Sequence, residues 1–514
     1  MPTNTLRALA GALSLAVWTA GCTVGPDFVR PAPQVPAHWS PRAIETPTTD
    51  GHPAPGATAA MTRVTEQSSD LRAWWAGFND PILNSLIDRA VRSNLDLRTA
   101  MLRVDEAGVQ RAIAAAAWWP TVAIDASFTR QRLSETTPTG SLFNSVGNLR
   151  LPGGGGISVP NPYNQFQLST AASWELDLFG RVRRSVEAAD ANVQVSAEDR
   201  HAVWMSLLAD VTQNYLELRG TQTRLRVSQE NLATLEQLLD LTRQRRAAGM
   251  TTDIDVSNAA AQDYSIRASL PAFELQITQS INSLSRLIGR EPEALRTELQ
   301  APVGEVIVPP DISIGLPADL VRRRPDIREA EANLHAATAQ IGVAVANLFP
   351  RLTLAANGGF QSESAAKLLE WASRFGSIGP ALDLPIFDRG RWATVHLYDV
   401  RAQEAAVAYQ RTVLDALHEV ENALAAHGTD QQRRTWLEAT VRESRDAVTL
   451  SRQRYESGIE NFINVLDAER TLQQSELSLA DSGTAVRIDL VTLYRALGGG
   501  WETSDVPPQV STPP

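Results

Sequence analysis

Side chains able to carry chemistry are few and scattered in this 514-residue chain. The seven histidines form no HExxH motif and no cluster with cysteine. His418 and His427 share a predicted helix but are nine residues apart, a poor spacing for joint metal ligands. The glycine run Gly153–Gly156 lacks the Lys-Ser/Thr that completes a phosphate-binding loop, so a loop between two strands explains it better. The sequence therefore predicts no catalytic centre, no metal site and no cofactor.

Cys22 is the only cysteine, so the monomer can form no internal disulfide. It follows a segment with the layout of a secretory signal, in which Arg7 supplies positive charge and Ala8–Trp18 is apolar. Small residues then precede the cysteine, and Thr19–Cys22 resembles a lipobox, with Thr19 where leucine is usual. We expect residues 1–21 to be removed as a signal peptide and Cys22 to carry a lipid. The alternative is a nearby cleavage that leaves a free, exposed thiol.

The residue after this cysteine is Thr23 and not aspartate. By resemblance to enterobacterial sorting rules, this favours the outer membrane over the inner one. One acyl chain anchors a protein only weakly, so a second element should embed the chain. That element is no apolar helix, because the sequence has no apolar run of about 20 residues.

The charge balance argues against broad nucleic-acid binding. The formal net charge is −11, which repels phosphate backbones unless a local basic stripe exists. The one short basic run, Arg322–Arg324, has no aromatic residues interleaved with it and is interpreted as a solvated helix start. Long polar and apolar alternations rich in Ala, Leu, Arg, Glu and Gln instead predict a mainly helical protein.

An internal repeat of roughly 200 residues organises the chain. Shifted by 230 residues, Asn94–Arg98 matches Arg324–Arg328. Shifted by 208 or 209 residues, two later segments match in the same order: Phe179–Arg181 with Phe387–Arg389, and Leu241–Gly249 with Leu450–Gly458. We predict a tether over residues 22–75, repeats at 76–300 and 318–498, a linker at 301–317 and a flexible tail at 499–514.

Each repeat begins with a helix and continues with two strands. The helices are Pro81–Trp118 and Ala318–Leu348, each ended by a proline. The strands, at about 121–130, 165–178, 351–361 and 376–387, alternate apolar with polar residues, which fits a membrane barrel with lipid outside and water inside. Acids on the polar face suit a wet lumen: Asp125, Glu175, Asp177 and Asp383. A soluble sandwich is the alternative, but four strands are too few for one.

Four strands cannot close a transmembrane barrel, and an open sheet edge in lipid leaves unpaired backbone groups. The chain should therefore oligomerise, and the pattern alone permits a dimer or a trimer. Very long helices follow the strands: Arg181–Ala248 would extend roughly 100 Å. Gly249 breaks it before Asp253–Ile288 returns; Arg391–Ser457 breaks at Gly458 before Asn461–Leu497 returns. Such helices must pack side by side as a wall.

Three stretches carry a resemblance to a known family. LPADLVRRRPDIREAE (Leu316–Glu331), Trp74–Leu97 and Tyr455–Leu472 resemble the outer-membrane factor family of tripartite efflux systems, of TolC and OprM type. The first of them is similar to the NodT-like lipoprotein branch that serves RND-type pumps. The resemblance implies a homotrimer, in which a 12-stranded outer-membrane β-barrel continues into a long periplasmic α-helical barrel.

The same resemblance implies a passive exit duct for drugs and small toxic compounds, and no enzyme. Its partners would be outer-membrane lipid, a periplasmic adaptor and an inner-membrane RND transporter. Two alternatives keep the architecture and change the cargo, to metal ions or to secreted proteins. The chain has only five methionines, and this small number argues against metal ions as the cargo. A periplasmic coiled-coil scaffold without a pore is a further alternative, and it predicts no membrane strands.

In this family the tips of the helical hairpins close the duct, so the residues around Gly249 and Gly458 become candidates for docking and gating. Asp255 follows Gly249 by six residues, as Asn464 follows Gly458, and Asp467 lies one helical turn beyond. Copies of Asp255 and Asp467 around the axis would form acidic rings, which favour cations and repel one another.

Three further residues complete the predicted gate. Ile463 would add a hydrophobic constriction beside the acids. Tyr455 matches a family tyrosine that ties neighbouring hairpins together. Glu460 stands where TolC-type proteins carry an arginine, so the closing bonds of that subtype are not expected here.

Overall fold

The computed structural model describes residues 23–40, 63–67, 70–138, 141, 161–301, 306–309 and 311–502. The predicted signal peptide, Cys22, the Gly153–Gly156 run and the predicted tail beyond residue 502 lie outside these residues. Two compact units share the chain: residues 1–29, 107–192 and 334–405 form the first, and the remaining residues form the second.

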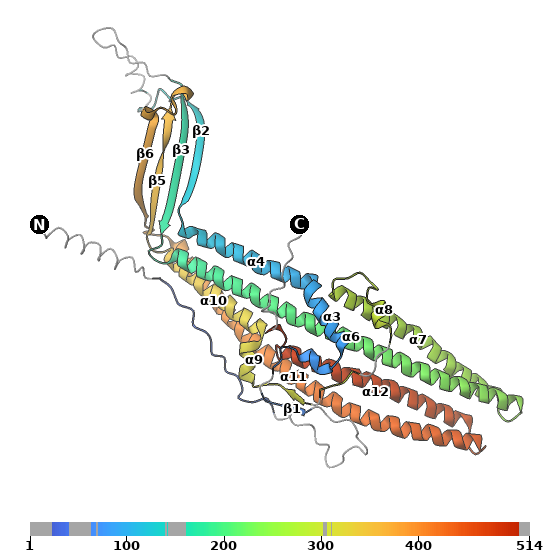
Figure 1. The fold of residues 1–514 in the computed structure, drawn as a ribbon. Coiled ribbons are helices and arrows are strands. Elements are labelled where there is room, and N and C mark those ends of the chain that lie inside the picture. The colour runs from blue at the N-terminus through green and yellow to red at the C-terminus, as the bar shows by residue number, and fades with distance from the viewer. Residues whose placement is uncertain are drawn as a thin grey trace, which may run out of the picture. The chain divides into compact units, whose positions relative to one another are not determined.

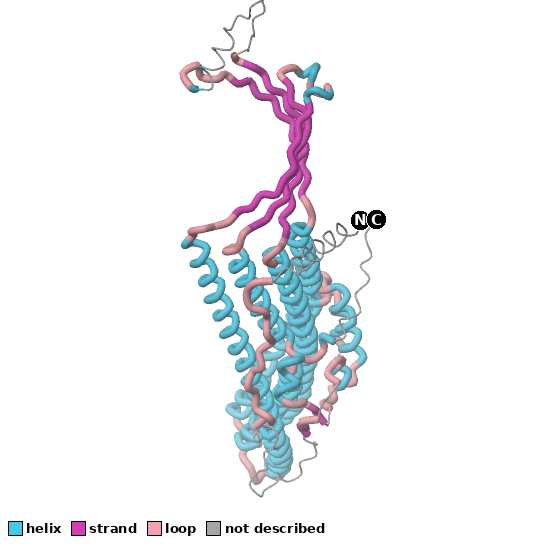
Figure 2. The backbone as a smooth tube through the Cα atoms, turned by 90° about the vertical axis from the view of Figure 1, so that its left-hand side faces the viewer, coloured by secondary structure: helices cyan, strands magenta, loops and turns pink. Residues whose placement is uncertain are grey.

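The first unit contains one antiparallel sheet of four strands in the order β2-β3-β5-β6 (Figures 1 and 2). The strands are β2 (Thr121–Gln131), β3 (Tyr163–Leu176), β5 (Arg351–Ser362) and β6 (Arg374–Asp383). Repeat one therefore supplies one neighbouring pair and repeat two the other. Among the described strands, β2 and β6 each pair along one side only, so the sheet has two open edges.

The strand register gives the sheet two chemically different faces. Val122 pairs with Ala172 and Phe128 with Phe166, and the last two rings lie 4.7 Å apart on one face. That face continues through Trp174 and Leu354 into β6. The other face is mainly polar or small, with paired positions Asp125, Ser169, Gly359, Gln167 and Gln361, although Phe375 opposite Gly359 also lies on it. The period-two alternation in the sequence thus corresponds to the pleat of the sheet.

Two details of the strands differ from the sequence prediction. β6 ends at Asp383 and not near residue 387, because Pro385 has no N–H for a ladder hydrogen bond. Asp177 belongs to no strand: its carboxylate accepts from the backbone N–H groups of Val182 and Arg183 at 3.0 Å and caps the next helix. Glu175, which does lie in β3, is paired with Arg181 at 2.6 Å. Because both carboxylates are engaged by groups of their own chain, Asp177 and Glu175 do not support the prediction of a water-filled lumen.

The long helices have nearly the predicted bounds. α6 (Arg181–Ala247) and α11 (Arg389–Glu456) have 67 and 68 residues, and each begins in the first unit and ends in the second. The returning helices are α7 (Asp253–Leu287) and α12 (Phe462–Ala496). Gly220, the only glycine in α6, lies against α12: a Cβ there would be 2.2 Å from Oγ1 of Thr484.

The helix that opens each repeat is divided, which the sequence analysis did not predict. Repeat one has α3 (Pro81–Ser93), α4 (Leu95–Ala115) and a 3-10 turn at Ala116–Trp118; repeat two has α9 (Pro317–Arg323) and α10 (Pro325–Ala346). Asn94 and Arg324 are extended at the two breaks. Asn94 accepts from the N–H of Leu97 and so starts a new helix, while Pro325 excludes the helical conformation for Arg324.

The basic run Arg322–Arg324 is consequently no solvated helix start. Arg324 is 5% exposed and bonds to Asp326, to Glu419 and to the carbonyl of Ala496. It lies at the edge of the main hydrophobic core of the second unit, which α3, α6, α11 and α12 build around Leu83, Tyr215, Val420 and Leu490.

Short elements complete the fold. In the second unit, β1 (Arg63–Thr65) pairs in parallel with β4 (Asp311–Ser313). The same unit contains the 3-10 turn Trp74–Phe78 and α8 (Arg296–Leu299). In the first unit, 3-10 turns at Ala365–Lys367 and Trp371–Ser373 join β5 to β6. The described part of the predicted tether is extended and bound: Trp39 is buried and donates from Nε1 to the carbonyl of Gly315 at 2.9 Å.

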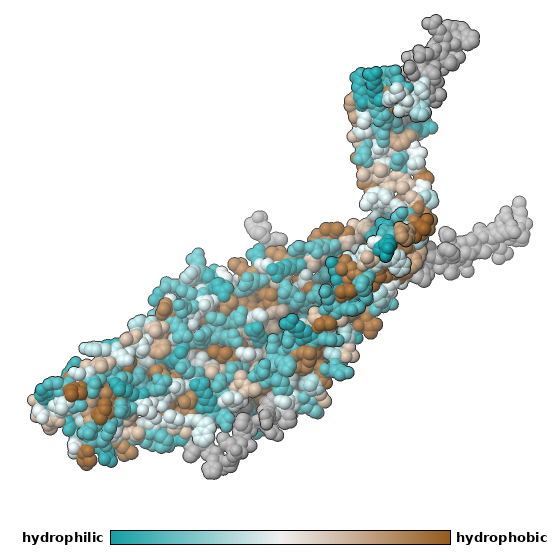
Figure 3. All heavy atoms as spheres, turned by 180° about the vertical axis from the view of Figure 1, so that it is seen from behind, coloured by the Kyte–Doolittle hydropathy of each residue, from teal (hydrophilic) through white to brown (hydrophobic). Residues whose placement is uncertain are grey.

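The surface of the helices is mainly hydrophilic on the face shown in Figure 3, with single hydrophobic residues scattered over it. In the described ranges, every helix is either too short or too polar to cross a membrane. Exposed hydrophobic side chains are denser around the sheet of the first unit, where Trp119, Ile378, Ile386, Phe387 and Trp392 are each at least 67% exposed.

Candidate site at the hairpin tips

The two hairpin turns of the second unit have the same backbone construction. Gly249 has φ +77°, its N–H donates to the carbonyl of Arg246, and the next N–H donates to Arg245. Gly458 has φ +75°, with the corresponding bonds to Tyr455 and Arg454. A Cβ at either glycine would meet no described atom within 4 Å, so the left-handed backbone and not crowding requires glycine. We call residues 245–255 the first tip and residues 454–467 the second tip.

Asp255 in the first tip is a helix cap. It forms a capping box with Thr252, and its Oδ2 also accepts from the hydroxyl groups of Thr251 at 2.6 Å and Thr252 at 2.8 Å. Partial desolvation works to raise the pKa of Asp255, but these hydrogen bonds outweigh it, so the pKa is lowered. The carboxylate is therefore ionised at neutral pH and already holds the start of α7 in place.

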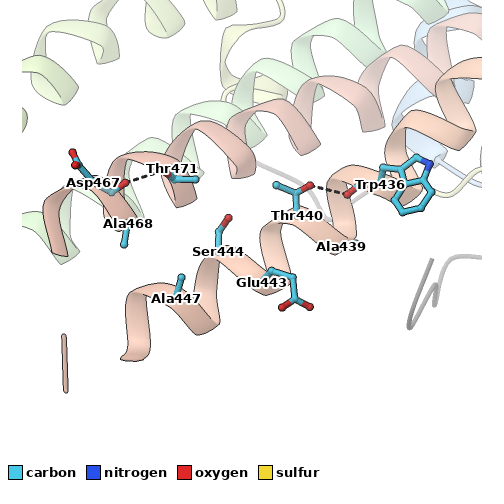
Figure 4. A pocket seen from close by; sticks show the side chains of 9 residues that line it. All are labelled: Trp436, Ala439, Thr440, Glu443, Ser444, Ala447, Asp467, Ala468 and Thr471. Carbon is cyan, nitrogen blue, oxygen red and sulfur yellow. Dashed lines mark hydrogen bonds between the residues drawn. The ribbon is translucent and has the colours of Figure 1, made fainter. Parts of the chain in front are cut away.

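Asp467 in the second tip has a different environment. Its side chain is 64% exposed, and Arg470 on the same helix lies 3.8 Å away. It stands beside an open groove of about 600 Å³ between α11 and α12, lined mainly by small residues and ended by Trp436 (Figure 4). The hydroxyl group of Thr471 donates a hydrogen bond to the backbone carbonyl of Asp467. This hydrogen bond does not involve the carboxylate of Asp467.

Glu460 and Asn464 form a small bonded group at the second tip. Glu460 pairs with Nε of Arg454 at 3.1 Å, and the amide of Asn464 donates to the other carboxylate oxygen. Ile463 is 43% exposed, whereas its neighbour Phe462 is buried. Ile463 is therefore an apolar group at the surface of the tip. Glu460 neutralises an arginine of the same chain, Arg454.

Tyr455 joins the two tips of one chain. Its ring is buried, packs on Phe462 with centroids 5.5 Å apart, and lies under the guanidinium of Arg245 at 4.4 Å. Arg245 also donates from Nη1 to the carbonyl of Tyr455 at 2.9 Å. Beneath this contact a hydrophobic cluster from all four helices contains Leu235, Leu239 and Leu466. These contacts link the two tips of one chain directly.

The sequence analysis did not predict Arg245 as a tip residue, although it links the two tips. The signal was present, because the 209-residue shift that aligns the glycines also aligns Arg245 with Arg454. Arg245 binds the opposite tip, whereas Arg454 binds Glu460 within its own. The two acids predicted to act together have separate partners in one chain, Thr251 and Thr252 for Asp255, and Arg470 for Asp467.

Neither the tips nor the rest of the described chain brings three His, Cys, Asp or Glu side chains together as ligands for a metal ion. The tips offer instead exposed carboxylates, an exposed isoleucine and two glycine turns at the ends of long rods.

Known proteins resemble this chain over most of its length. The model of the family described as outer membrane efflux protein matches residues 86–290 and 316–499. The chain is 33% identical over 492 residues to the outer membrane protein OprJ of Pseudomonas aeruginosa, covering 96% of this chain and 95% of OprJ. It is 32% identical over 498 residues to the toluene efflux pump outer membrane protein TtgF of Pseudomonas putida, covering 95% and 96%.

A solved structure of the outer-membrane channel OprN superimposes with a TM-score of 0.79 at 32% identity, covering 94% of this chain and all of that one. The mainly helical fold with four strands per chain is thus that of outer-membrane channels, and the expectation that the chain is a channel component and not an enzyme follows from the same likeness. The chain belongs to the outer membrane efflux protein family and is an outer-membrane channel of an efflux pump.

Proposed function

We propose that the chain works as a homotrimer, anchored by a lipid on Cys22, that forms the exit duct of a tripartite RND-type pump. In this proposal a periplasmic adaptor links it to an inner-membrane RND transporter, and the cargo is drugs and small toxic compounds. Two relatives support this cargo class by their names, since TtgF belongs to a toluene pump and ArpC of Pseudomonas putida to an antibiotic pump. The duct itself supplies no energy.

The observation that carries the proposal is the sheet with two faces and two open edges. One face carries Val122, Phe128, Trp174 and Leu354, and the other carries Asp125, Gln167 and Gln361. Each unpaired backbone group at an edge would cost several kcal/mol in lipid. Pairing β6 of one chain with β2 of the next removes the edges, and three copies give twelve strands, enough to enclose a water-filled pore.

Gating is assigned to the tips. In the proposed trimer, three copies of Asp467 and of Asp255 surround a narrow axis, with Ile463 as an apolar constriction and Tyr455 and Arg245 holding the tips of each chain together. Glu460 and Asn464 stiffen the second turn through Arg454. Docking of the adaptor and pump around Gly249 and Gly458 would move the hairpins outward, and repulsion between like charges assists that movement.

The test of the whole proposal is made in the source bacterium. Deletion of the gene should increase sensitivity to a panel of antibiotics and solvents, and the intact gene should restore resistance. Outer membranes should yield a heat-modifiable trimer whose N-terminal peptide carries the mass of acyl chains on Cys22. A water-soluble monomer with no affinity for detergent, or a deletion without any change in sensitivity, would refute it.

A further inference from the structure

The segment of residues 23–29, here called the strap, is bound to the first unit by its backbone. The N–H of Val24 donates to the carbonyl of Phe179 at 3.2 Å, as a strand-like contact at the turn between β3 and α6. Arg184, in the first turn of α6, donates from Nε to the carbonyl of Val24 at 3.3 Å and from Nη2 to that of Gly25 at 3.4 Å. The strap thus satisfies donors of a helix that begins some 160 residues later.

Arg184 is a buried cation with two acidic partners. Its side chain is 4% exposed, and it pairs with Asp27 of the strap at 2.6 Å and with Glu187 of its own helix at 2.8 Å. Desolvation lowers the pKa of Arg184, but these acids outweigh it and the pKa is raised. Asp27 is itself 87% exposed, so its position is not explained by burial of its own side chain.

Glycines make the close approach possible. Gly25 has φ +91°, and a Cβ on it would lie 2.5 Å from Cα of Gly342 in α10. A Cβ on Gly342 would in turn lie 2.8 Å from Cγ and Cδ of Arg184. At the β3–α6 turn, a Cβ on Gly180 would lie 3.0 Å from Cα of Thr23. Gly180 and Gly342 therefore form a seat into which the backbone of the strap fits at Thr23 and Gly25.

The far end of the strap is held by an aromatic contact. Phe28 stacks on the ring of His335 with centroids 4.4 Å apart and an interplanar angle of 17°. His335 contacts Glu187 through Nε2 at 3.1 Å, so one carboxylate serves both Arg184 and His335. α6, α10 and the strap are joined through a single bonded network.

We propose that Arg184, Gly342 and Gly180 form a docking site for this strap, and that the site fixes the membrane anchor to the sheet. The inference rests on the proposed lipid at Cys22, which precedes Thr23 by one residue and so lies within about 3.8 Å of it between Cα atoms. A lipid attached through a loose tether would hold the protein to the membrane at no defined place. The docked strap makes the anchor and the sheet enter the membrane as one body, and Arg184 is a positioning residue for the anchor.

A purely structural role for Arg184 would need fewer contacts. Glu187, three residues along the same helix, already compensates its charge. The remaining donors all go to the strap, to two carbonyl oxygens and one exposed acid. That distribution indicates a guanidinium that binds a backbone segment.

The test measures docking and assembly separately in the full-length protein. A spin label on Val29→Cys, at a side chain that is 80% exposed, reports the mobility of the strap. Gly342→Val should exclude the strap sterically, and Asp27→Asn, on an exposed side chain, should release it without disturbing the helices. Asp27→Glu should keep it docked. Asp190→Asn is the matched control, because it removes an exposed ion pair with Arg111 in the same unit.

In Gly342→Val and Asp27→Asn we expect a mobile label and a several-fold loss of heat-stable trimer in the outer membrane, with the lipid mass on the N-terminal peptide unchanged. A label that stays immobile in both variants, or trimer that forms normally with the strap released, would overturn the proposal. A label found on Cys22 as well would show a free thiol and would overturn the lipidation alone. Label mobility in a Cys22→Ser background then still tests the docking site.

Discussion

Asn94 and Arg324 make the same contact in the two repeats with different chemistry. The amide of Asn94 donates to the carbonyl of Leu287, in the last turn of α7, at 2.9 Å. The guanidinium of Arg324 donates to the carbonyl of Ala496, in the last turn of α12, at 2.8 Å. The shifts that align the repeats align both donors and both acceptors. Each divided opening helix is thus fastened at its break to the end of its own hairpin.

Loss of Arg324 should destabilise the second unit. Arg324→Met leaves Asp326 and the Ala496 carbonyl without their donor in a buried place. A fully buried pair costs about 3–5 kcal/mol when one partner is removed; here about 2 kcal/mol is expected, because both acids are partly exposed. The midpoint of thermal unfolding, followed by circular dichroism in detergent, measures it. The exposed Arg322→Met should leave the midpoint unchanged; equal effects would contradict the assignment.

Two glycines in long helices should respond to alanine with opposite signs. Gly428→Ala in α11 meets no described atom within 4 Å and should gain up to about 1 kcal/mol of helix propensity. Gly220→Ala has the same propensity gain, but its Cβ collides with Thr484, so the folded state should lose stability. Thermal unfolding of both variants checks the prediction, and a rise in both midpoints would show that α6 and α12 lie farther apart.

Arg245→Ala should loosen the tips. The substitution removes the hydrogen bond to the Tyr455 carbonyl and the contact between the guanidinium and the Tyr455 ring, both of which link the two tips of one chain. We expect a higher open probability in planar lipid bilayers. Arg243→Ala, which loses only an exposed pair with Asp240, is the control and should conduct like the parent.

Asp467→Ala should raise single-channel conductance, because it removes an exposed charge and side-chain bulk from the proposed constriction. Asp240→Ala removes an acid of similar exposure on another helix, α6, and should leave the conductance unchanged. An unchanged conductance and open probability in Asp467→Ala would remove this residue from the gate.

Asp489 should make stability depend on pH. Burial, together with the like charge and the hydrogen bond of nearby Asp430 on α11, raises the pKa of Asp489 to about 7. Because the folded state then holds a proton that the unfolded chain releases near pH 3.8, stability should fall as pH rises from about 4 to 7 and level off above. Asp489→Asn should therefore unfold at a higher temperature than the parent at pH 8 and at a similar one at pH 4. A constant difference across that range would assign the effect to packing.

The sequence predicted best what has a local period. Alternation of Phe166 and Leu168 with Gln165 and Gln167 gave the faces of β3, because successive side chains of a strand must point to opposite sides. Gly249 and Gly458 marked the turns, since a left-handed residue has few substitutes. Asp177 was placed wrongly, because the alternating pattern continues past the end of β3 into the helix cap.

Long-range contacts left no local signal. Arg324 lies in a run of three arginines and looks solvated; only the distant Ala496 and Glu419 make it a buried residue. The docking of Asp27 on Arg184 joins residues 157 positions apart. In both cases a charged side chain is buried by a partner that is distant in sequence and that no periodic pattern predicts. The internal repeat, by contrast, could have identified Arg245 through its counterpart Arg454.

The open edges of the sheet also bear on inheritance. Among the described strands, β2 and β6 each pair along one side only, so a protomer with a damaged edge strand would disrupt its pairing with every protomer it joins. In a cell that produces normal and edge-defective chains together, most assembled oligomers would contain at least one defective protomer. Such an allele would be dominant-negative, whereas an allele whose product never folds would only reduce the number of protomers available for assembly.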